Sequence, residues 1–255
     1  MKIPTFDLTG KVALVTGGTK GIGFGMAMAL AHYGADVAIV GRNVEDGHAA
    51  ERELQTKNVK AKFFKADVTD KTQVTTMVQQ VVEEFGKIDI LVNNAGMNIR
   101  KPLIEVEEED WDRVVTTNLK GIFLVGQAVA RQMIQQNSGG RIINISSILG
   151  AIGMPNQTSY AASKGGINQL TKVWACELAP YQITVNAIGP AYIRTPMTKD
   201  WLAEPERYRN IVNSTLLNRI GDLEDLAGPV VFLASDASSY ITGHVLYVDG
   251  GWLAR

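Results

Sequence analysis

The sequence predicts a single α/β domain built around a doubly wound parallel sheet, and three observations favour that fold class. Short β-branched apolar runs alternate with longer segments of helical period, which is typical of repeated βαβ units. No linker-like composition, internal repeat or low-complexity tract divides the 255 residues. A content of 45% hydrophobic and 20% charged residues fits one compact core. We therefore expect residues 1–255 to form one domain with a seven-stranded sheet flanked by helices.

Each element can be placed from these patterns. The strand-like runs are residues 11–16, 36–40, 61–65, 88–92, 141–145, 184–188 and 244–248, and the helical segments are 21–32, 44–57, 72–85, 111–136, 158–178 and 223–233. Because parallel strands need a crossover, this alternation predicts right-handed βαβ connections. Residues 192–217 are too long for a strand-to-helix loop and contain Trp201 between two prolines, so we expect a substrate lid there.

Composition excludes several classes of protein. A net charge of -1 and a pI near 6.3 argue against a nucleic-acid partner. No apolar run reaches the length of a membrane span, and the first residues lack the core of a signal peptide. The single cysteine, Cys176, excludes an internal disulfide and suits a reducing compartment, so we expect a cytoplasmic protein. His32, His48 and His244 have no metal-ligand spacing, and no metal is expected.

A glycine-rich turn, from Gly17 to Gly23, follows the first predicted strand and opens a predicted helix. Glycines allow the backbone to approach a pyrophosphate, and the helix amino terminus offers unpaired N–H groups to its charge. The spacing Gly-x3-Gly-x-Gly differs from the common Gly-x-Gly-x-x-Gly fingerprint. Taken alone, the turn fits either a dinucleotide site or a tight connection without a ligand.

The end of the second strand indicates which cofactor is used. Proteins that prefer NAD place an acid there against the ribose 2′-hydroxyl, but this chain has Gly41, followed by Arg42 and Asn43. Lys20 in the glycine turn supplies a second cation. Two cations without a carboxylate favour a 2′-phosphate, so we predict NADP(H) over NAD(H). The alternative is that both cations are solvated surface charges.

A tyrosine and a lysine stand four residues apart at the start of a predicted helix. This spacing places Tyr160 and Lys164 on one face of the helix. A nearby ammonium stabilises a phenolate, so we expect Lys164 to lower the pKa of Tyr160 and enable it to exchange a proton. Ser146 and Ser147 end the strand before it, at the edge where α/β sheets hold their ligands.

These motifs together resemble the short-chain dehydrogenase/reductase family. The resemblance runs from about Leu8 to Gly251 and rests on ordered motifs: Thr16-Gly17-x3-Gly21-x-Gly23, Asn93-Asn94-Ala95-Gly96, Asn118, Ser147 and Tyr160-x3-Lys164. It implies a Rossmann fold and hydride transfer between a nicotinamide and a carbonyl or secondary alcohol. The segment 248–252 resembles one that the family uses between subunits, which implies a homotetramer.

The resemblance also implies roles for single residues. Tyr160 would be the acid–base, Lys164 its modulator and a ribose ligand, Ser147 the partner of the substrate oxygen, and Asn118 the holder of a relay water. The cofactor contacts would be Gly17, Thr19, Lys20, Gly21, Ile22, Gly23, Arg42, Asn43, Asp67, Val68, Asn94, Ala95, Gly96, Tyr160, Lys164, Ile193 and Thr195. Ala191 departs from the family, which usually has glycine there. It precedes Ile193 and Thr195, which the resemblance places against the nicotinamide carboxamide. Ser146 is the competing hydroxyl and is expected to be structural.

The substrate is the least determined part of the prediction. Positions expected to face it are Asn98, Ile99, Ser147, Leu149, Gly153, Met154, Tyr192 and Trp201. The resemblance allows a broad carbonyl reductase, which we favour modestly, a 3-oxoacyl-acyl-carrier-protein reductase, or a gluconate-type sugar-acid dehydrogenase. Arg131 matches one of two docking arginines of the second group, whereas Tyr181 replaces the other. Arg100 favours the third group, since a guanidinium near the entrance can meet a carboxylate. A non-catalytic NADP-binding sensor remains an alternative of another class.

Overall fold

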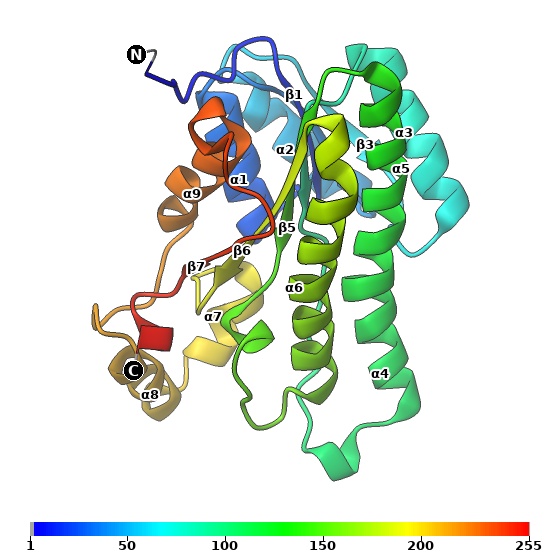
Figure 1. Cartoon of the computed structure of the whole chain (residues 1–255). Helices are drawn as coiled ribbons and strands as arrows, with labels where there is room; N and C mark the ends of the chain where they lie inside the picture. The colour runs from blue at the N-terminus through cyan, green and yellow to red at the C-terminus, as the bar shows by residue number, and fades with distance from the viewer. Residues whose placement is uncertain (1–2, 255) are drawn as a thin grey trace.

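The computed structural model describes residues 3–254, and all of its strands belong to one parallel sheet of order β3-β2-β1-β4-β5-β6-β7 (Figure 1). The strands are β1 (Val12–Thr16), β2 (Asp36–Gly41), β3 (Ala61–Lys65), β4 (Ile90–Asn93), β5 (Gly140–Ile145), β6 (Ile183–Pro190) and β7 (Val245–Val248). The predicted seven-stranded, doubly wound Rossmann sheet is therefore confirmed.

The strand order reverses beside β1, and this reversal positions the ligand crevice. Leu14 pairs with Ala38 of β2 on one side and with Leu91 of β4 on the other. The chain crosses from β1 to β2 on one side and from β4 to β5 on the other. The loops after β1 and β4 therefore separate at the carboxyl edge of the sheet. Doubly wound sheets bind their ligands at such a switch point.

Helices cover both faces of the sheet. The helices α1 (Gly21–His32), α2 (Val44–Gln55) and α9 (Glu224–Ala234) lie on one face, and α3 (Lys71–Phe85), α5 (Gly121–Gln136) and α6 (Thr158–Leu178) lie on the other (Figure 1). Side chains alternate along the strands: Ala13 and Val15 pack in the first layer, whereas Leu14 packs in the second. Because both faces are buried, the strands read as continuous apolar runs rather than alternating ones.

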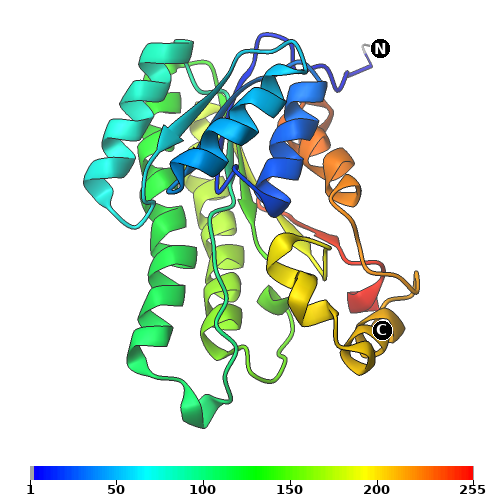
Figure 2. The same ribbon diagram turned by 180° about the vertical axis from the view of Figure 1, so that it is seen from behind.

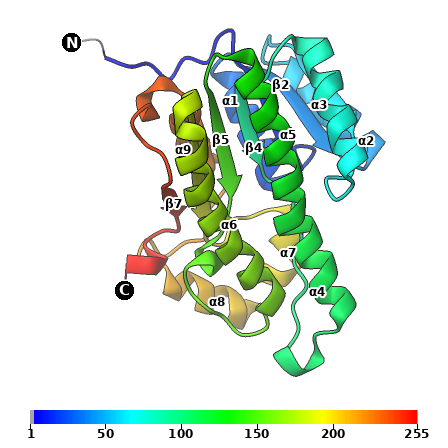
Figure 3. The same cartoon turned by 45° about the vertical axis from the view of Figure 1, so that its right-hand side comes forward.

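The segment expected as one helix, 111–136, has three parts. It begins earlier, as α4 (Glu108–Val115), passes through a π-helical turn at Thr116–Lys120, and continues as α5. Figure 3 shows α4 extending the line of α5 beyond the sheet. Single π turns inside α-helices occur frequently at functional sites, and this one contains Asn118.

The predicted lid is helical rather than an extended loop. It folds into α7 (Pro196–Leu202) and α8 (Pro205–Ser214), which lie near the C-terminus in Figure 2. Each helix has proline at its first position, where the missing N–H costs nothing. Thr195 and Glu204 cap the two helices through their side chains. Most other element boundaries differ from the predicted ones by only one or two residues, as is usual for frayed ends.

Candidate active site

The glycine turn after β1 forms a cradle that no side chain can enter. Gly17 has φ +61°, and a Cβ on Gly23 would lie 2.3 Å from the carbonyl oxygen of Gly17. The amino terminus of α1 follows, and its N-cap residue, Lys20, makes no side-chain capping bond. The first N–H groups of α1 thus have no side-chain cap, which is the arrangement that suits a pyrophosphate.

A cleft of about 560 Å³ runs from this turn to the ends of β4 and β5. Every residue predicted to contact the cofactor lines it except Ile193, which is buried and lines a smaller neighbouring cavity instead. Ala191, where glycine was expected, has no positive φ, so alanine causes no backbone strain. The glycine cradle and the volume of the cleft fit a dinucleotide.

The structure corrects one premise of the cofactor prediction, the absence of a carboxylate near the two cations. Lys20 Nζ lies 2.6 Å from Asp46 Oδ2, and Arg42 lies 3.7 Å from Asp67 Oδ2. Asp46 lines the cleft and was not predicted to do so. Its sequence signal was its place in the first turn of α2, where Asn43 caps its backbone N–H. Gly41 cannot easily become an acid, because a Cβ there would lie 2.8 Å from Thr19.

Ser147, Tyr160 and Lys164 come together at the other end of the cleft. Tyr160 and Lys164 lie one turn apart on α6, with the Lys164 ammonium 5.4 Å from the centre of the phenol ring. The ammonium is buried and donates to the carbonyl oxygen of Ile145 at 2.7 Å. This bond attaches α6 to the end of β5, which also holds the serines.

Burial is the largest influence on the pKa values of Tyr160 and Lys164. Burial raises the pKa of Tyr160, while the Ser147 hydroxyl and the charge of Arg100 act to lower it. Burial also lowers the pKa of Lys164 to about 8. In the protein without a cofactor the pKa of the phenol lies above its usual value, and the lowering expected from Lys164 stays a prediction. Its ammonium bonds to Ile145 rather than to the phenol oxygen, so desolvation dominates.

The two serines after β5 have separate environments. Ser146 donates to Asn168 Oδ1 at 2.6 Å and lies 3.3 Å from the carbonyl oxygen of Lys164. Its hydroxyl hydrogen is thus engaged by the scaffold. Ser147 accepts only a backbone N–H, from Leu149, and hydrogen-bonds to Tyr160. Ser147 is the hydroxyl that can share a substrate oxygen with the phenol.

Asn118 lies in the π turn and is fully buried. Its Oδ1 accepts from the Met97 N–H and its Nδ2 donates to the Met97 carbonyl, both at 2.8 Å. The same Nδ2 also lies 3.2 Å from Ser163 Oγ. Both amide donors are therefore used, and the side chain holds the loop after β4. The role of Asn118 as the holder of a relay water stays a prediction.

The predicted substrate residues form an aromatic cluster under the lid. The rings of Tyr192 and Trp201 stack with centroids 5.1 Å apart and planes at 10°. Tyr192 also contacts Met154, with 3.7 Å between the hydroxyl and the sulfur. Arg100 and Arg207 lie over the Trp201 ring at 4.6 and 4.8 Å. Tyr192, Met154 and Trp201 line two smaller cavities, whereas Asn98, Ile99, Gly153 and the buried Leu149 line none of those described.

Two buried polar atoms in this region have no hydrogen-bond partner. Within residues 3–254 the unpaired buried side-chain atoms are Asn98 Oδ1, Arg100 Nε and Thr184 Oγ1. Asn98 donates through Nδ2 to Gln157 at 2.9 Å, which fixes the amide and leaves its oxygen unpaired. Native proteins pair nearly all such atoms, so unpaired ones need an explanation. Both Asn98 and Arg100 lie in the segment after β4 that was predicted to face the substrate, so they are candidates to bind a polar ligand.

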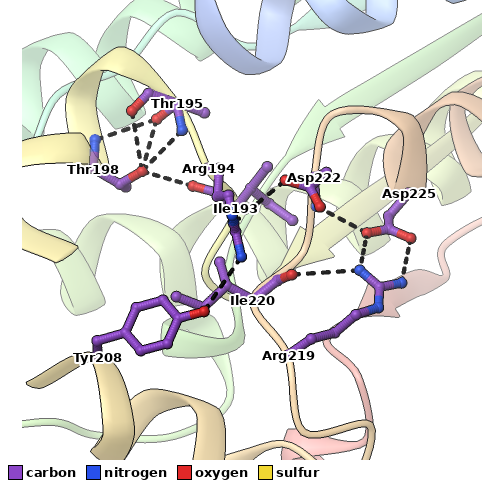
Figure 4. A network of polar contacts seen from close by, with 9 residues as sticks. All are labelled: Ile193, Arg194, Thr195, Thr198, Tyr208, Arg219, Ile220, Asp222 and Asp225. Atoms are coloured by element: carbon purple, nitrogen blue, oxygen red, sulfur yellow. Dashed lines mark hydrogen bonds and ion pairs between the residues drawn. The ribbon is translucent and has the colours of Figure 1, made fainter. Parts of the chain in front are cut away.

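The lid is fixed to the loop before α9 by a polar network (Figure 4). Arg194 lies 3.5 Å from Asp222 and donates to the Tyr208 hydroxyl at 3.3 Å. Arg219 binds Asp225 through two contacts of 2.6 Å. At the lid's first turn, Thr198 donates to the carbonyl oxygen of Ile193 at 2.7 Å. These contacts hold the ends of the segment, and Arg207 donates to the Trp201 carbonyl oxygen at 2.8 Å within it.

The described residues offer neither a metal-binding cluster nor a membrane-spanning helix. Residues 3–254 contain no group of three or more His, Cys, Asp or Glu side chains arranged to hold a metal ion. In the same part of the chain, no helix is both long and apolar enough to cross a membrane.

Known proteins are similar to this chain in sequence and in fold. A family model described as enoyl-(acyl carrier protein) reductase matches residues 17–253. The chain is 44% identical to a 2-dehydro-3-deoxy-D-gluconate 5-dehydrogenase of Dickeya dadantii, over all of both chains. It is 44% identical to a 3-oxoacyl-acyl-carrier-protein reductase of Thermotoga maritima, over 96% of this chain and 98% of that one.

A solved structure adds a match in three dimensions. The gluconate 5-dehydrogenase of Burkholderia cenocepacia, in complex with NADP and tartrate, superposes with a TM-score of 0.95 at 37% identity, covering 98% of each chain. The residues of the glycine turn, the serine pair and the Tyr160–Lys164 pair lie together in one cleft, as the resemblance implied. The chain belongs to the short-chain dehydrogenase/reductase family and is an oxidoreductase that acts on CH–OH groups.

Proposed function

We propose that the protein is an NADP(H)-dependent dehydrogenase of a sugar acid, with Tyr160 as its acid–base. It would interconvert a secondary alcohol and a ketone on a polyhydroxy carboxylic acid. Relatives named for gluconate and 2-dehydro-3-deoxy-D-gluconate support this substrate class. This proposal replaces the broad carbonyl reductase that the sequence alone favoured.

The observation that carries the proposal is the unpaired guanidinium nitrogen of Arg100. Its Nε is buried without a hydrogen-bond partner, and no ion pair described for residues 3–254 includes Arg100. Its charge acts on the phenols of both Tyr160 and Tyr192, so the guanidinium lies close to the reacting end of the site. A buried donor atom without a partner is costly, and a substrate carboxylate relieves that cost with a charge-assisted hydrogen bond.

The chain's own groups supply position and proton transfer. The nicotinamide, when bound, accepts or donates the hydride. Ser147 orients the substrate oxygen, and Tyr160 takes the hydroxyl proton in oxidation or returns it in reduction. The high pKa of Tyr160 in the free protein means that the bound cofactor and substrate must favour the phenolate. Lys164, whose ammonium lies 5.4 Å from the centre of the ring, and Arg100, whose charge acts on the phenol, are the cations available for that task.

NADP(H) is the cofactor that we propose, with NAD(H) as the alternative. Arg42 is the cation best placed to receive a 2′-phosphate, because its side chain is exposed at the edge of the cleft. The ion pair described for it is a long contact of 3.7 Å to Asp67. Guanidinium groups bind phosphates through paired donors. The solved relative with bound NADP supports the same choice.

We also propose a cytoplasmic homotetramer. The free thiol of Cys176 suits a reducing compartment. Apolar side chains remain exposed on α5 at Phe123, on α6 at Val173 and before β7 at Tyr240, and these faces would be covered by other subunits. Light scattering at micromolar concentration tests the assembly: four subunits are expected, and a monomer would contradict it.

Replacing Arg100 with methionine tests the substrate class. For a sugar acid such as gluconate, we expect Arg100→Met to lower kcat/KM about 100-fold, the loss of a charge-assisted hydrogen bond in a buried site. A neutral polyol should lose less than about threefold, since it has no carboxylate to bind. Arg207→Met is the matched control, because Arg207 also stacks on Trp201 but bonds to the Trp201 carbonyl at 2.8 Å. Arg207→Met should change kcat/KM little for either substrate.

A panel of substrates separates the alternatives. Preference for a 3-oxoacyl thioester, unaffected by Arg100→Met, would replace the proposal with an acyl-carrier-protein reductase, for which Arg131 is the docking candidate. Preference for a neutral ketone would restore the broad carbonyl reductase. NADP binding without turnover of any of these compounds would favour a sensor.

A further inference from the structure

The nucleotide end of the cleft contains two cations and two carboxylates that face one another. Lys20, Arg42, Asp46 and Asp67 all line it, and their four formal charges cancel. A site for a 2′-phosphate needs a net positive charge, so which cation stays available decides the cofactor.

The two carboxylates differ in how they are held. Asp67 Oδ1 accepts from the N–H and the hydroxyl of Thr69 at 2.9 and 2.8 Å, so one carboxylate oxygen is already engaged by the backbone turn. Its contact with Arg42 is long, at 3.7 Å. Asp46 has no such side-chain restraint among its described contacts, and it meets Lys20 directly at 2.6 Å. Arg42 therefore keeps most of its charge for a ligand, whereas Lys20 does not.

The local backbone fixes Asp46 in this position. It is the third residue of α2, and its N–H donates to Asn43 Oδ1 at 3.0 Å, so the helix begins with Asp46 pointing along the cleft edge. Acidic residues are favoured in the first turn of a helix by the macrodipole. The ion pair is partly exposed, with 62% of the Lys20 side chain and 34% of the Asp46 side chain accessible. A ligand phosphate can therefore compete with Asp46 for Lys20.

We propose that Asp46 sets the cofactor preference by neutralising Lys20. A cofactor with a 2′-phosphate must draw Lys20 away from Asp46 and approach that carboxylate, while a cofactor with a free 2′-hydroxyl leaves the pair intact. The protein thus binds NADP(H) more weakly than its two cations alone would allow and retains affinity for NAD(H). This inference rests on the cofactor site proposed above but not on the substrate.

The test measures binding in the absence of any substrate. Dissociation constants of NADP⁺, NAD⁺, 2′,5′-ADP and 5′-AMP are measured by calorimetry for the wild type and for Asp46→Asn, which keeps the side-chain shape and the Asn43 cap. We expect Asp46→Asn to bind NADP⁺ and 2′,5′-ADP about fivefold more tightly, with the other two ligands changed less than about twofold, the range expected for a screened surface pair.

Two controls sharpen the result. Glu45→Gln removes the same charge one residue earlier, from an exposed side chain that does not line the cleft, and should leave all four constants unchanged. In a Lys20→Met background, Asp46→Asn should have a smaller effect, because the cation that it releases is gone. The preference gained by Asp46→Asn should also shrink at high salt.

Equal tightening of all four ligands, or an effect no larger than that of Glu45→Gln, would overturn the inference. Because no turnover is measured, failure of the sugar-acid assignment leaves this result standing. Weaker binding of NADP⁺ than NAD⁺ in the wild type would refute the proposed cofactor. The effect of Asp46→Asn on their ratio would still test Asp46.

Discussion

The polar groups beneath Tyr160 and those beneath the lid differ in how completely they are hydrogen-bonded. Around α6 and β5, Asn118, Ser146 and Lys164 are buried and each bonds to backbone or to another side chain. In the segment after β4, Asn98 Oδ1 and Arg100 Nε are also buried and have no partner. The first region is complete without a ligand, and the second is not.

This difference separates the catalytic centre from the region that recognises the substrate. A satisfied network is rigid and holds Ser147 and Tyr160 in place before any substrate arrives. Unpaired donors and acceptors raise the free energy of the empty site and lower it when a matching ligand binds. Family membership therefore explains the first region, and the substrate must be inferred from the second.

Removing the phenol oxygen tests the paired region most severely. Tyr160→Phe deletes the proton-transferring group while keeping the ring, so kcat should fall about 1,000-fold or more. The dissociation constant of NADP⁺ should stay within about twofold, because the glycine cradle is untouched. Turnover within about tenfold of wild type would show that another group transfers the proton.

Removing the Ser147 hydroxyl should have the next largest effect. Ser147→Ala deletes one donor to the substrate oxygen, and losses of about 100-fold in kcat are typical for such donors. Ser146→Ala is the matched control: it breaks the bond to Asn168 and should affect stability more than turnover. If Ser146→Ala abolished kcat and Ser147→Ala did not, the two serines would exchange their assigned roles.

The buried ammonium of Lys164 should appear in the pH dependence of stability. Its pKa is about 8 when folded and 10.5 when unfolded. Between these values the unfolded chain binds the extra proton, so stability rises with pH and the gain is lost as pH falls toward 8. From pH 7 to pH 10, wild type should gain roughly 2–3 kcal/mol in urea unfolding relative to Lys164→Met. Parallel pH profiles for the two proteins would contradict the lowered pKa.

Two asparagine variants compare the regions at the smallest scale. Asn144 donates to Thr171 at 3.1 Å inside the paired network, so Asn144→Leu should cost about 1–3 kcal/mol of stability. Asn98→Leu removes an unpaired oxygen together with the bond that Nδ2 donates to Gln157, and because these effects oppose each other it should cost less, about 1 kcal/mol. It should instead lower kcat/KM for the sugar acid. Equal destabilisation by both variants would remove the distinction between the regions.

Much of this architecture was predictable because its determinants are local in sequence. The glycine turn, the Tyr160–Lys164 spacing and the serine pair are short motifs, and each lies in the cleft. The strands were recognisable because both faces of the sheet are buried, which makes them continuous apolar runs. The order of the motifs along the chain then implied the family.

The features that the sequence did not reveal depend on contacts between distant residues. Lys20 and Asp46 are 26 positions apart and meet only because α2 begins beside the glycine turn. The π turn contains Asn118, whose side chain is hydrogen-bonded to the distant Met97. No local residue preference predicts such a turn. The pKa of Tyr160 is raised by burial, which the pairing with Lys164 alone could not indicate.

A crystal structure with NADP⁺ and a sugar acid such as gluconate tests the central claim most directly. The account predicts the carboxylate against Arg100 Nε, a substrate hydroxyl at Asn98 Oδ1, and the reacting carbinol oxygen between Ser147 and Tyr160. A sugar acid bound with its carboxylate in solvent, and with Arg100 and Asn98 still unpaired, would contradict it.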